Sequence, residues 1–327
     1  MLVARLMARR NLGRDKKLIR LIFCIGLQLL STSAIADDVE NILFIISRDT
    51  SDYTKVVGLV EDDLRHGIKE YTFNTVLKDA QTEIDGAIEK ANIIVALGAG
   101  AADAAVSRKT GRPVVAALIT ESTFVAVAEK YQSSKVEALA SGLNVVLLDQ
   151  PVERSLKLAS ILLPKLNNVG LMLGPSSHAD APIFGKQLKD AGMVAQILSI
   201  TAEDNPIRKI DPVMKNADVF IPVPDSRLIN VTTAKWILQL SYRYRVPVIG
   251  FSKNYVNAGA LAAVYSSPED VARQTAEVIR SLPVGDPQNN KMHLPKYCTL
   301  KFNKNVAWHL DIQIKDEQFY HQRLCKL

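Results

Sequence analysis

The sequence has few of the residues that bind metals or carry out nucleophilic catalysis. Its 327 residues include three cysteines and five histidines, and the histidines are scattered. No histidine pair stands at helical spacing, no cysteine and histidine form a couple, and no serine lies in a nucleophile elbow. The spacing of Cys298 and Cys325 fits no zinc motif. We therefore expect a protein that is not an enzyme and has no metal site.

Nucleotide-binding motifs are also missing. The segment "LGAGAADAA" carries Asp103 where a dinucleotide fingerprint has its third glycine, and no Walker loop occurs anywhere in the chain. The formal net charge of +6 comes from the amino terminus, where the first 36 residues hold seven of the 40 basic residues and one of the 34 acidic residues. The remainder is neutral. We expect no cofactor and no nucleic-acid partner.

The amino-terminal segment differs in kind from the rest. Seven basic residues lead into the apolar run "LIRLIFCIGLQLL" and then "STSAIA", which is typical of a secretory signal peptide over residues 1–36. The small residues Ala34 and Ala36 favour cleavage near Ala36 and export to the periplasm. A retained membrane anchor is the alternative, although the apolar run is short for a bilayer that needs about 20 residues.

After this segment, short runs rich in Val, Ile and Leu alternate with helical patterns, which predicts parallel strands joined by crossover helices. The alternation restarts after residue 166, so we expect an α/β fold of two doubly wound parallel-sheet lobes. The predicted strands are residues 41–47, 71–77, 92–98, 113–120 and 143–149 in the first half, and 168–174, 194–200, 218–224 and 246–252 in the second.

The last third departs from this alternation. The run "ALAAVYS" follows the strand at 246–252 by a gap too short for a helical crossover, so we expect it to cross to the other lobe. A helix then begins at Ser267 as N-cap, with Pro268 at its first position. The Pro- and Asn-rich residues 283–296 would form a third crossing. We expect residues 37–147 plus 260–290 in lobe one, and 148–259 plus 291–327 in lobe two.

Ligands of doubly wound sheets lie beyond the carboxyl ends of the strands. This rule selects ligand-binding candidates without any motif. They are Arg48, Asp49, Gly98, Ala99, Gly100, Ala101, Thr120 and Ser122 in the first half, and Ser176, Ser177, Asp225, Ser226, Phe251 and Ser252 in the second.

Several of these residues have two readings. The loop at 98–101 is either a tight turn into a helix or a loop whose amides hold a carboxylate. Asp225 either caps the next helix or binds a ligand ammonium group. Arg48 and Arg227 either clamp a carboxylate or are solvated. Cys298 and Cys325 either form a disulfide or stay separate.

Four segments resemble the type I periplasmic substrate-binding proteins of ABC transporters, in the group of tryptophan- and tyrosine-type binders. The strongest is "VPVIGFSKNYVNAGALAAVYSSPEDVARQTAEVI", and the others are "NNVGLMLGPSS", "NADVFIPVPDSRLIN" and "KFNKNVAWHLDIQI". The resemblance covers nearly all of residues 39–314. It departs from the amino-acid binders at "GPSS", where they usually have an asparagine-proline turn, and at Pro224, where they have threonine.

The resemblance implies two lobes joined by three crossing strands, which capture a small ligand and deliver it to an ABC permease in the inner membrane. The ligand would be amino-acid-like or a small carboxylate. The alternative within the same fold is a periplasmic ligand-sensing partner of a membrane sensor kinase. An exported enzyme of similar shape is a third hypothesis.

Overall fold

The structure is a computed structural model that describes residues 39–132, 134–201, 203–225, 227–282 and 291–325. The expected signal peptide (residues 1–36) and the candidate Ser226 lie outside the described residues. By their contacts, residues 40–327 group together as one unit. Within the described part of the chain, no helix is long and apolar enough to cross a membrane.

The first sheet contains six parallel strands in the order β11-β5-β4-β3-β1-β2. In chain order they are β1 (Glu40–Ile46), β2 (Tyr71–Leu77), β3 (Ile93–Leu97), β4 (Val114–Ile119), β5 (Leu143–Leu147) and β11 (Met292–His293). Five of the six were predicted, to within a residue or two at the ends. Four of them are largely buried and read as continuous apolar runs, whereas β2 is a mostly exposed edge strand.

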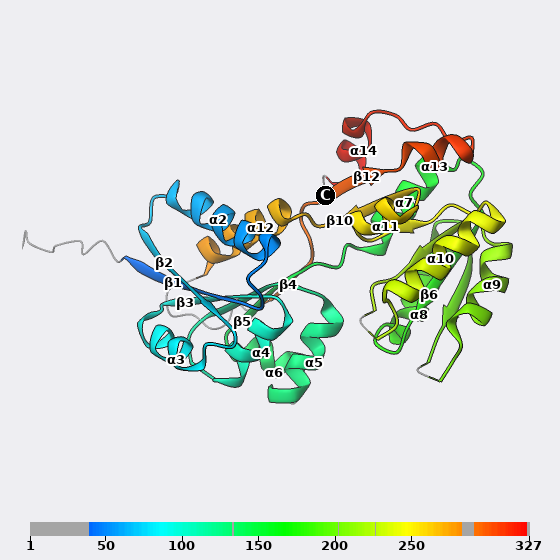
Figure 1. Ribbon diagram of the computed structural model, residues 1–327. Helices are drawn as coiled ribbons and strands as arrows, with labels where there is room; N and C mark the ends of the chain where they lie inside the picture. The colour runs from blue at the N-terminus through cyan, green and yellow to red at the C-terminus, as the bar shows by residue number, and fades with distance from the viewer. Residues whose placement is uncertain (1–38, 133, 202, 226, 283–290, 326–327) are drawn as a thin grey trace, which may run out of the picture. The chain divides into compact units, whose positions relative to one another are not determined.

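Both faces of this sheet are buried. Along β1, Ile42 and Phe44 pack on one face against α2 (Ser51–Arg65) and α12 (Pro268–Ser281), and Figure 1 shows these two helices side by side. Leu43 and Ile45 belong to the core on the other face. That face is covered by α3 (Gln81–Lys90), α4 (Ala99–Ser107), α5 (Glu121–Gln132) and α6 (Lys135–Ala140). The alternation follows from the two-residue repeat of a strand.

The second half of the chain contains two three-stranded sheets joined by a parallel bridge between Phe220 and Val248. One has the order β7-β6-β8 and the other β12-β10-β9. Their strands are β6 (Asn168–Leu173), β7 (Val194–Ser199), β8 (Val219–Pro222), β9 (Ile249–Gly250), β10 (Ala262–Tyr265) and β12 (Thr299–Phe302). The pairings are parallel except for β12, which is antiparallel to β10.

Helices cover both faces of these strands as well. One core contains residues of α7 (Val152–Leu162), α8 (Ala181–Asp190) and α14 (Glu317–Leu324), and the other contains residues of α9 (Pro206–Asn216), α10 (Val231–Tyr244) and α11 (Lys253–Ala258). Two shorter helices, η1 (His178–Asp180) and α13 (Lys304–His309), complete the described set. The fold is therefore α/β and doubly wound in both halves, as predicted.

The prediction that "ALAAVYS" cannot pair with its predecessor is wrong. β10 pairs in parallel with β9, through Ala262 to Ile249 and Ala263 to Gly250. The short helix α11 makes the crossover and ends at Gly259, whose φ of +122° suits glycine and turns the chain back. Because β9 and β10 pair over only two residues each, the short segment that contains α11 is long enough to connect them in parallel.

Three segments pass between the first sheet and the other two. The first joins β5 to α7, the second joins β10 to α12, and the third joins β11 to β12. β10, which the expected boundaries assign to lobe one, pairs with β9 and β12, while β11, which they assign to lobe two, pairs with β5.

The carboxyl-terminal tail is held to the second half of the chain by a disulfide. Cys298 and Cys325 are bonded, with their Cα atoms 5.2 Å apart. Both are buried in the same core as Tyr320 and Leu324 of α14. Of the two readings of these cysteines, the structure has the disulfide.

Candidate functional site

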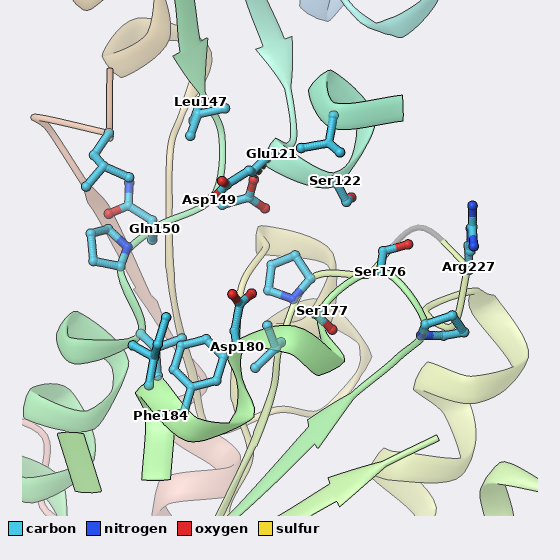
Figure 2. Close-up of a pocket in the computed structure, with 18 of the residues that line it drawn as sticks. Glu121, Ser122, Leu147, Asp149, Gln150, Ser176, Ser177, Asp180, Phe184 and Arg227 are labelled. Atoms are coloured by element: carbon cyan, nitrogen blue, oxygen red, sulfur yellow. Dashed lines mark hydrogen bonds between the residues drawn. The ribbon is translucent and has the colours of Figure 1, made fainter. Parts of the chain in front are cut away.

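A cavity of about 690 Å³ lies where strand ends of the two halves of the chain meet. From the first half it is lined by Glu121 and Ser122, which follow β4, and by Leu147 and Asp149 at the end of β5. From the second half it is lined by residues that follow β6 and β8, among them Ser176, Ser177, Pro224 and Arg227. Figure 2 shows these two groups facing the same space.

The remaining lining residues come from α5, from the crossings, from the start of α7 and from the segment η1–α8. Apolar side chains include Val152, Ile183, Phe184 and Leu294. Ile183 and Leu294 are 55% and 59% exposed, so the cavity offers uncovered apolar surface. Such a concave space with mixed apolar and polar walls is what small-ligand sites require.

Of the thirteen sequence candidates that the structure describes, three line this cavity: Ser122, Ser176 and Ser177. A fourth, Asp225, lies buried behind the loop that carries the two serines. Its Oδ2 accepts hydrogen bonds from the amides of Ser176 and Ser177 at 2.9 and 3.0 Å and from the Ser177 hydroxyl at 2.9 Å. Gly174 permits this approach, since a Cβ there would lie 2.6 Å from the Asp225 carboxyl carbon.

Asp225 thus does something that neither reading of the sequence included. It holds the loop after β6, and its Oδ1 accepts from the amide of Arg227 at 2.9 Å, whereas the N-cap of α10 is Asn230. The residue positions the cavity wall rather than capping the following helix.

The other described candidates do not line the cavity. Arg48 and Asp49 are exposed after β1, and Gly98 to Ala101 follow β3. In the sheet order, β3 and β1 lie one and two strands beyond β4, which displaces their ends by about 5 and 10 Å. Phe251 and Ser252 follow β9, one strand beyond β8. As ligand contacts these positions stay predictions.

Local hydrogen bonds account for several of them. The Ser47 hydroxyl accepts from the amide of Ala101 at 2.9 Å, so the start of α4 is capped from β1. Gly98 has a φ of +87°, and a Cβ there would lie 2.6 Å from the Tyr53 hydroxyl. Thr120 accepts from the amide of Thr123 at 3.2 Å at the start of α5. Ser252 is the N-cap of α11.

Asp149 is a lining residue that was not among the candidates, because it was counted as the last residue of the predicted strand at 143–149, whereas β5 ends at Leu147. Its Oδ2 accepts from the amide of Glu121 at 2.5 Å. Burial, followed by the nearby charge of Glu121, raises the pKa of Asp149 to about 6. Three other lining residues were also missed, since Gln150 lies in a crossing, Asp180 in the 3-10 helix η1 and Phe184 in α8.

A polar cluster joins the three crossings beside the cavity. We call Gln150, Arg154, Ser266 and the backbone of Pro295 to Tyr297 the crossing cluster. Gln150 Nε2 donates to the Ser266 hydroxyl at 2.8 Å and to the carbonyl of Tyr297 at 3.0 Å. Arg154, which is 3% exposed, donates to Gln150 and to the carbonyls of Pro295 at 2.9 Å and Lys296 at 3.3 Å.

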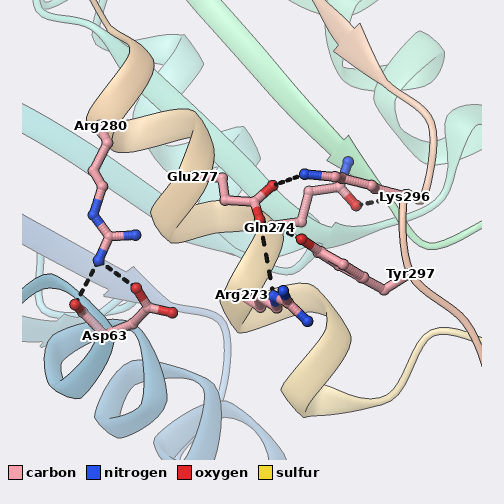
Figure 3. Close-up of polar contacts among 7 residues, drawn as sticks. All are labelled: Asp63, Arg273, Gln274, Glu277, Arg280, Lys296 and Tyr297. Atoms are coloured by element: carbon pink, nitrogen blue, oxygen red, sulfur yellow. Dashed lines mark hydrogen bonds and ion pairs between the residues drawn. The ribbon is translucent and has the colours of Figure 1, made fainter.

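The third crossing is also fastened to α12. Gln274 donates to the carbonyl of Leu294 and accepts from the amide of Lys296, both at 2.8 Å. Figure 3 shows Glu277 bonded to both Lys296 and Tyr297. The three crossings are thus restrained at one place, which lies next to the cavity because Gln150 belongs to both.

Comparison with known proteins agrees with this architecture. The model of a family described as ABC transporter substrate binding protein matches residues 40–321. A search of curated proteins finds no match.

Solved structures match over most of the chain. A ligand-free, open structure of CD0873, a substrate-binding protein with adhesive properties from Clostridium difficile, has a TM-score of 0.64 at 14% identity, covering 86% of this chain and 97% of that one. An ABC domain in complex with L-Trp from Streptococcus pneumonia has 0.55 at 15%, with 86% and 98% covered. A conserved domain protein from Vibrio cholerae has 0.55 at 18%, with 87% and 98% covered.

At these identities the solved structures show the fold, which is that of the type I periplasmic binding proteins. The family match spans most of the chain. The chain belongs to the ABC transporter substrate-binding protein family.

Proposed function

We propose that this protein captures a small molecule in the cavity between its two halves and delivers it to an ABC permease in the inner membrane. The observation that carries the proposal is the cavity itself, which is lined by strand-end loops from both halves and bordered by the first crossing through Gln150 and Pro151 and by the third through Leu294. In this proposal the protein is an exported binding protein without catalytic activity, and its signal peptide is cleaved near Ala36.

Binding would act by closing the two halves on the ligand. The exposed Ile183 and Leu294 would lose contact with water on closure, so a ligand that contacts both halves favours the closed state by its differential affinity. The loop at Ser176 and Ser177 is preorganised by Asp225, which lowers the cost of ordering it. We also propose the lobe boundaries expected from the sequence, with two changes. β10 belongs to lobe two and β11 to lobe one, because of the strands with which they pair.

Two measurements test this proposal. Native mass spectrometry of the protein purified from its source cells should detect a bound small molecule, and small-angle scattering should show a smaller radius of gyration before that molecule is removed than after. A folded protein that carries no small molecule and does not contract with a fractionated periplasmic extract would contradict it.

The importer role is tested by purifying the tagged protein from solubilised membranes. Recovery of a permease with its ATPase supports delivery to an importer. Recovery of a sensor kinase without them would overturn delivery and favour the sensing alternative.

A further inference from the structure

The walls of the cavity carry charge of predominantly one sign. Among the described residues that line it, Glu121, Glu129, Asp149, Glu153 and Asp180 are acidic, and Arg227 is the basic one. Figure 2 shows the carboxylates of Glu121 and Asp149 on one side and Asp180 on the other, directed toward the same space, with Arg227 at a distance from all three. The potential in the cavity therefore favours a cation.

Three backbone amides at the cavity that could bind an anion already donate to carboxylates of the protein. A carboxylate ligand of a doubly wound sheet is held by amides at strand ends. Here the amides of Ser176 and Ser177 donate to Asp225, and the amide of Glu121 donates to Asp149. A ligand carboxylate could bind these amides only by displacing the carboxylate of Asp225 or Asp149. It would then lie beside the displaced side chain, and the two negative charges would repel each other.

Closure of the two halves would bring acidic side chains from both halves closer together. Asp149 belongs to the first half of the chain and Asp180 to the second, so closing the halves without a ligand cation would bring like charges together in a space that loses water. Like charges in such a space disfavour each other, whereas a cation between them stabilises both. The burial that already raises the pKa of Asp149 shows that its charge is poorly solvated even before closure.

A metal ion does not fit this arrangement. Among the described residues, no group of three or more His, Cys, Asp or Glu side chains is placed to hold one. The cavity also has apolar walls, formed by Phe184, Ile183 and Leu147. The ring of Phe184 can attract the charged group of an organic cation and can also pack against the hydrocarbon part of the same ligand.

We propose that the ligand is an organic cation, with an ammonium or guanidinium group on an apolar body, whose charge lies between Asp149 and Asp180. The inference rests on the proposed function and departs from the ligand class expected from the sequence, which was an amino-acid-like molecule or a small carboxylate. The group that the site recognises is the cation, and a carboxylate on the ligand is not required.

Two sets of matched probes test the proposal by thermal shift and calorimetry. The first is tryptamine, L-tryptophan and indole propionate, and the second is cadaverine, aminocaproate and pimelate. Within each set the skeleton is similar while the charge runs from cation through zwitterion to anion. We expect the cation of at least one set to raise the melting temperature most and the anions to leave it unchanged.

Variants locate the effect. Asp180→Asn should weaken binding of the cation by about tenfold or more, since a charge-assisted contact is lost, and Glu121→Gln provides a second variant on the opposite wall. Asp190→Asn is the matched control, because Asp190 is exposed at the end of α8 and is not among the residues that line the cavity. It should bind as the parent does.

The outcomes separate the two proposals. If an anion or zwitterion binds as tightly as the matched cation, or if no cation of either set binds to the folded protein, the ligand class is wrong. The proposed function is judged independently, by the molecule that native mass spectrometry finds.

Discussion

At the scale of single residues, the buried carboxylate of Asp225 holds the cavity wall. Replacing it with alanine removes the acceptor of the Ser176 amide and leaves the Ser177 amide with only the carbonyl of Gly174, at 3.2 Å. We expect Asp225→Ala to lower the free energy of unfolding by about 2–4 kcal/mol and to weaken ligand binding, as measured by urea denaturation and calorimetry.

A matched control exists at the other end of β8. Asp218 also accepts from two successive amides, those of Asn167 and Asn168 at 2.9 and 2.7 Å, at the amino end of β6. It is exposed, so Asp218→Ala should cost less, about 1 kcal/mol, and leave binding unchanged. Equal losses of binding in both variants would contradict a specific role for Asp225.

Asp149 gives a pH-dependent prediction. Its pKa is about 6 in the folded protein and close to 3.8 when unfolded, so its contribution to stability is fully present below about pH 4 and is lost as the pH rises through 6. Asparagine keeps an acceptor for the Glu121 amide and cannot ionise. At pH 8, Asp149→Asn should be more stable than the parent by up to about 3 kcal/mol.

Denaturation at several pH values measures this difference, which should shrink toward zero near pH 4. The main charged neighbour is Glu121, so Glu121→Gln should lower the pKa of Asp149 and reduce the gain. If Asp149→Asn is less stable than the parent at pH 8, burial of the ionised Asp149 carboxylate does not destabilise the folded protein.

The residue scale also shows where prediction from sequence ended. The strand-end rule found Ser122, Ser176 and Ser177, because the cavity lies beyond β4 and β6. The rule could not predict which of the loops at one edge of a sheet lie nearest the cavity, because the order of the strands in the sheet is set by tertiary pairing. Arg48 and Phe251 were therefore weighted equally with residues that line the cavity. Asp149 was missed because the predicted strand ran to residue 149, two residues beyond the end of β5.

At the scale of elements, local signals were the more reliable guide. Ser267 and Asp270 form the predicted start of α12, where each side chain accepts the other's backbone amide in a capping box. β12 and the short α13 lie within "CTLKFNKNVAWHLDIQI", whose pattern is typical of a strand followed by a short helix, whereas the antiparallel pairing of β12 was not predicted. α11 was not, because its six residues carry too little periodicity to be separated from a loop.

The disulfide yields a prediction for α14. The bond between Cys298 and Cys325 spans 27 residues, and closing such a loop in the unfolded chain contributes about 3 kcal/mol. We expect reduction of the protein, or the double substitution Cys298→Ser and Cys325→Ser, to lower the free energy of unfolding by about this amount.

Tyr320 and Leu324 keep α14 in the core, so the reduced protein should remain folded at room temperature, with faster amide exchange in residues 317–325. The double variant should be insensitive to reductant, which serves as the control. Unchanged exchange in α14 after reduction would mean that packing alone fixes the tail.

At the scale of the whole molecule, the crossing cluster restrains the movement of one half relative to the other. Arg154 joins the first and third crossings without lining the cavity. Burial lowers the pKa of Arg154, yet a guanidinium remains charged at neutral pH. Arg154→Met removes the donor from buried carbonyls, and we expect a loss of about 2–4 kcal/mol in stability.

The informative result concerns motion. Spin labels at the exposed positions Lys90 on α3 and Lys215 on α9 report the distance between the two halves by pulsed electron resonance. Because the cluster ties three crossings at one place, Arg154→Met should broaden that distance distribution in the absence of ligand. Arg108→Met is the control, since Arg108 bonds only to Ala104, Asp85 and Gln81 among the described residues, all in the first half. Arg108→Met should lower stability without changing the width of the distance distribution. If the distribution in Arg154→Met is as narrow as in the parent, the crossings are stiff without the crossing cluster.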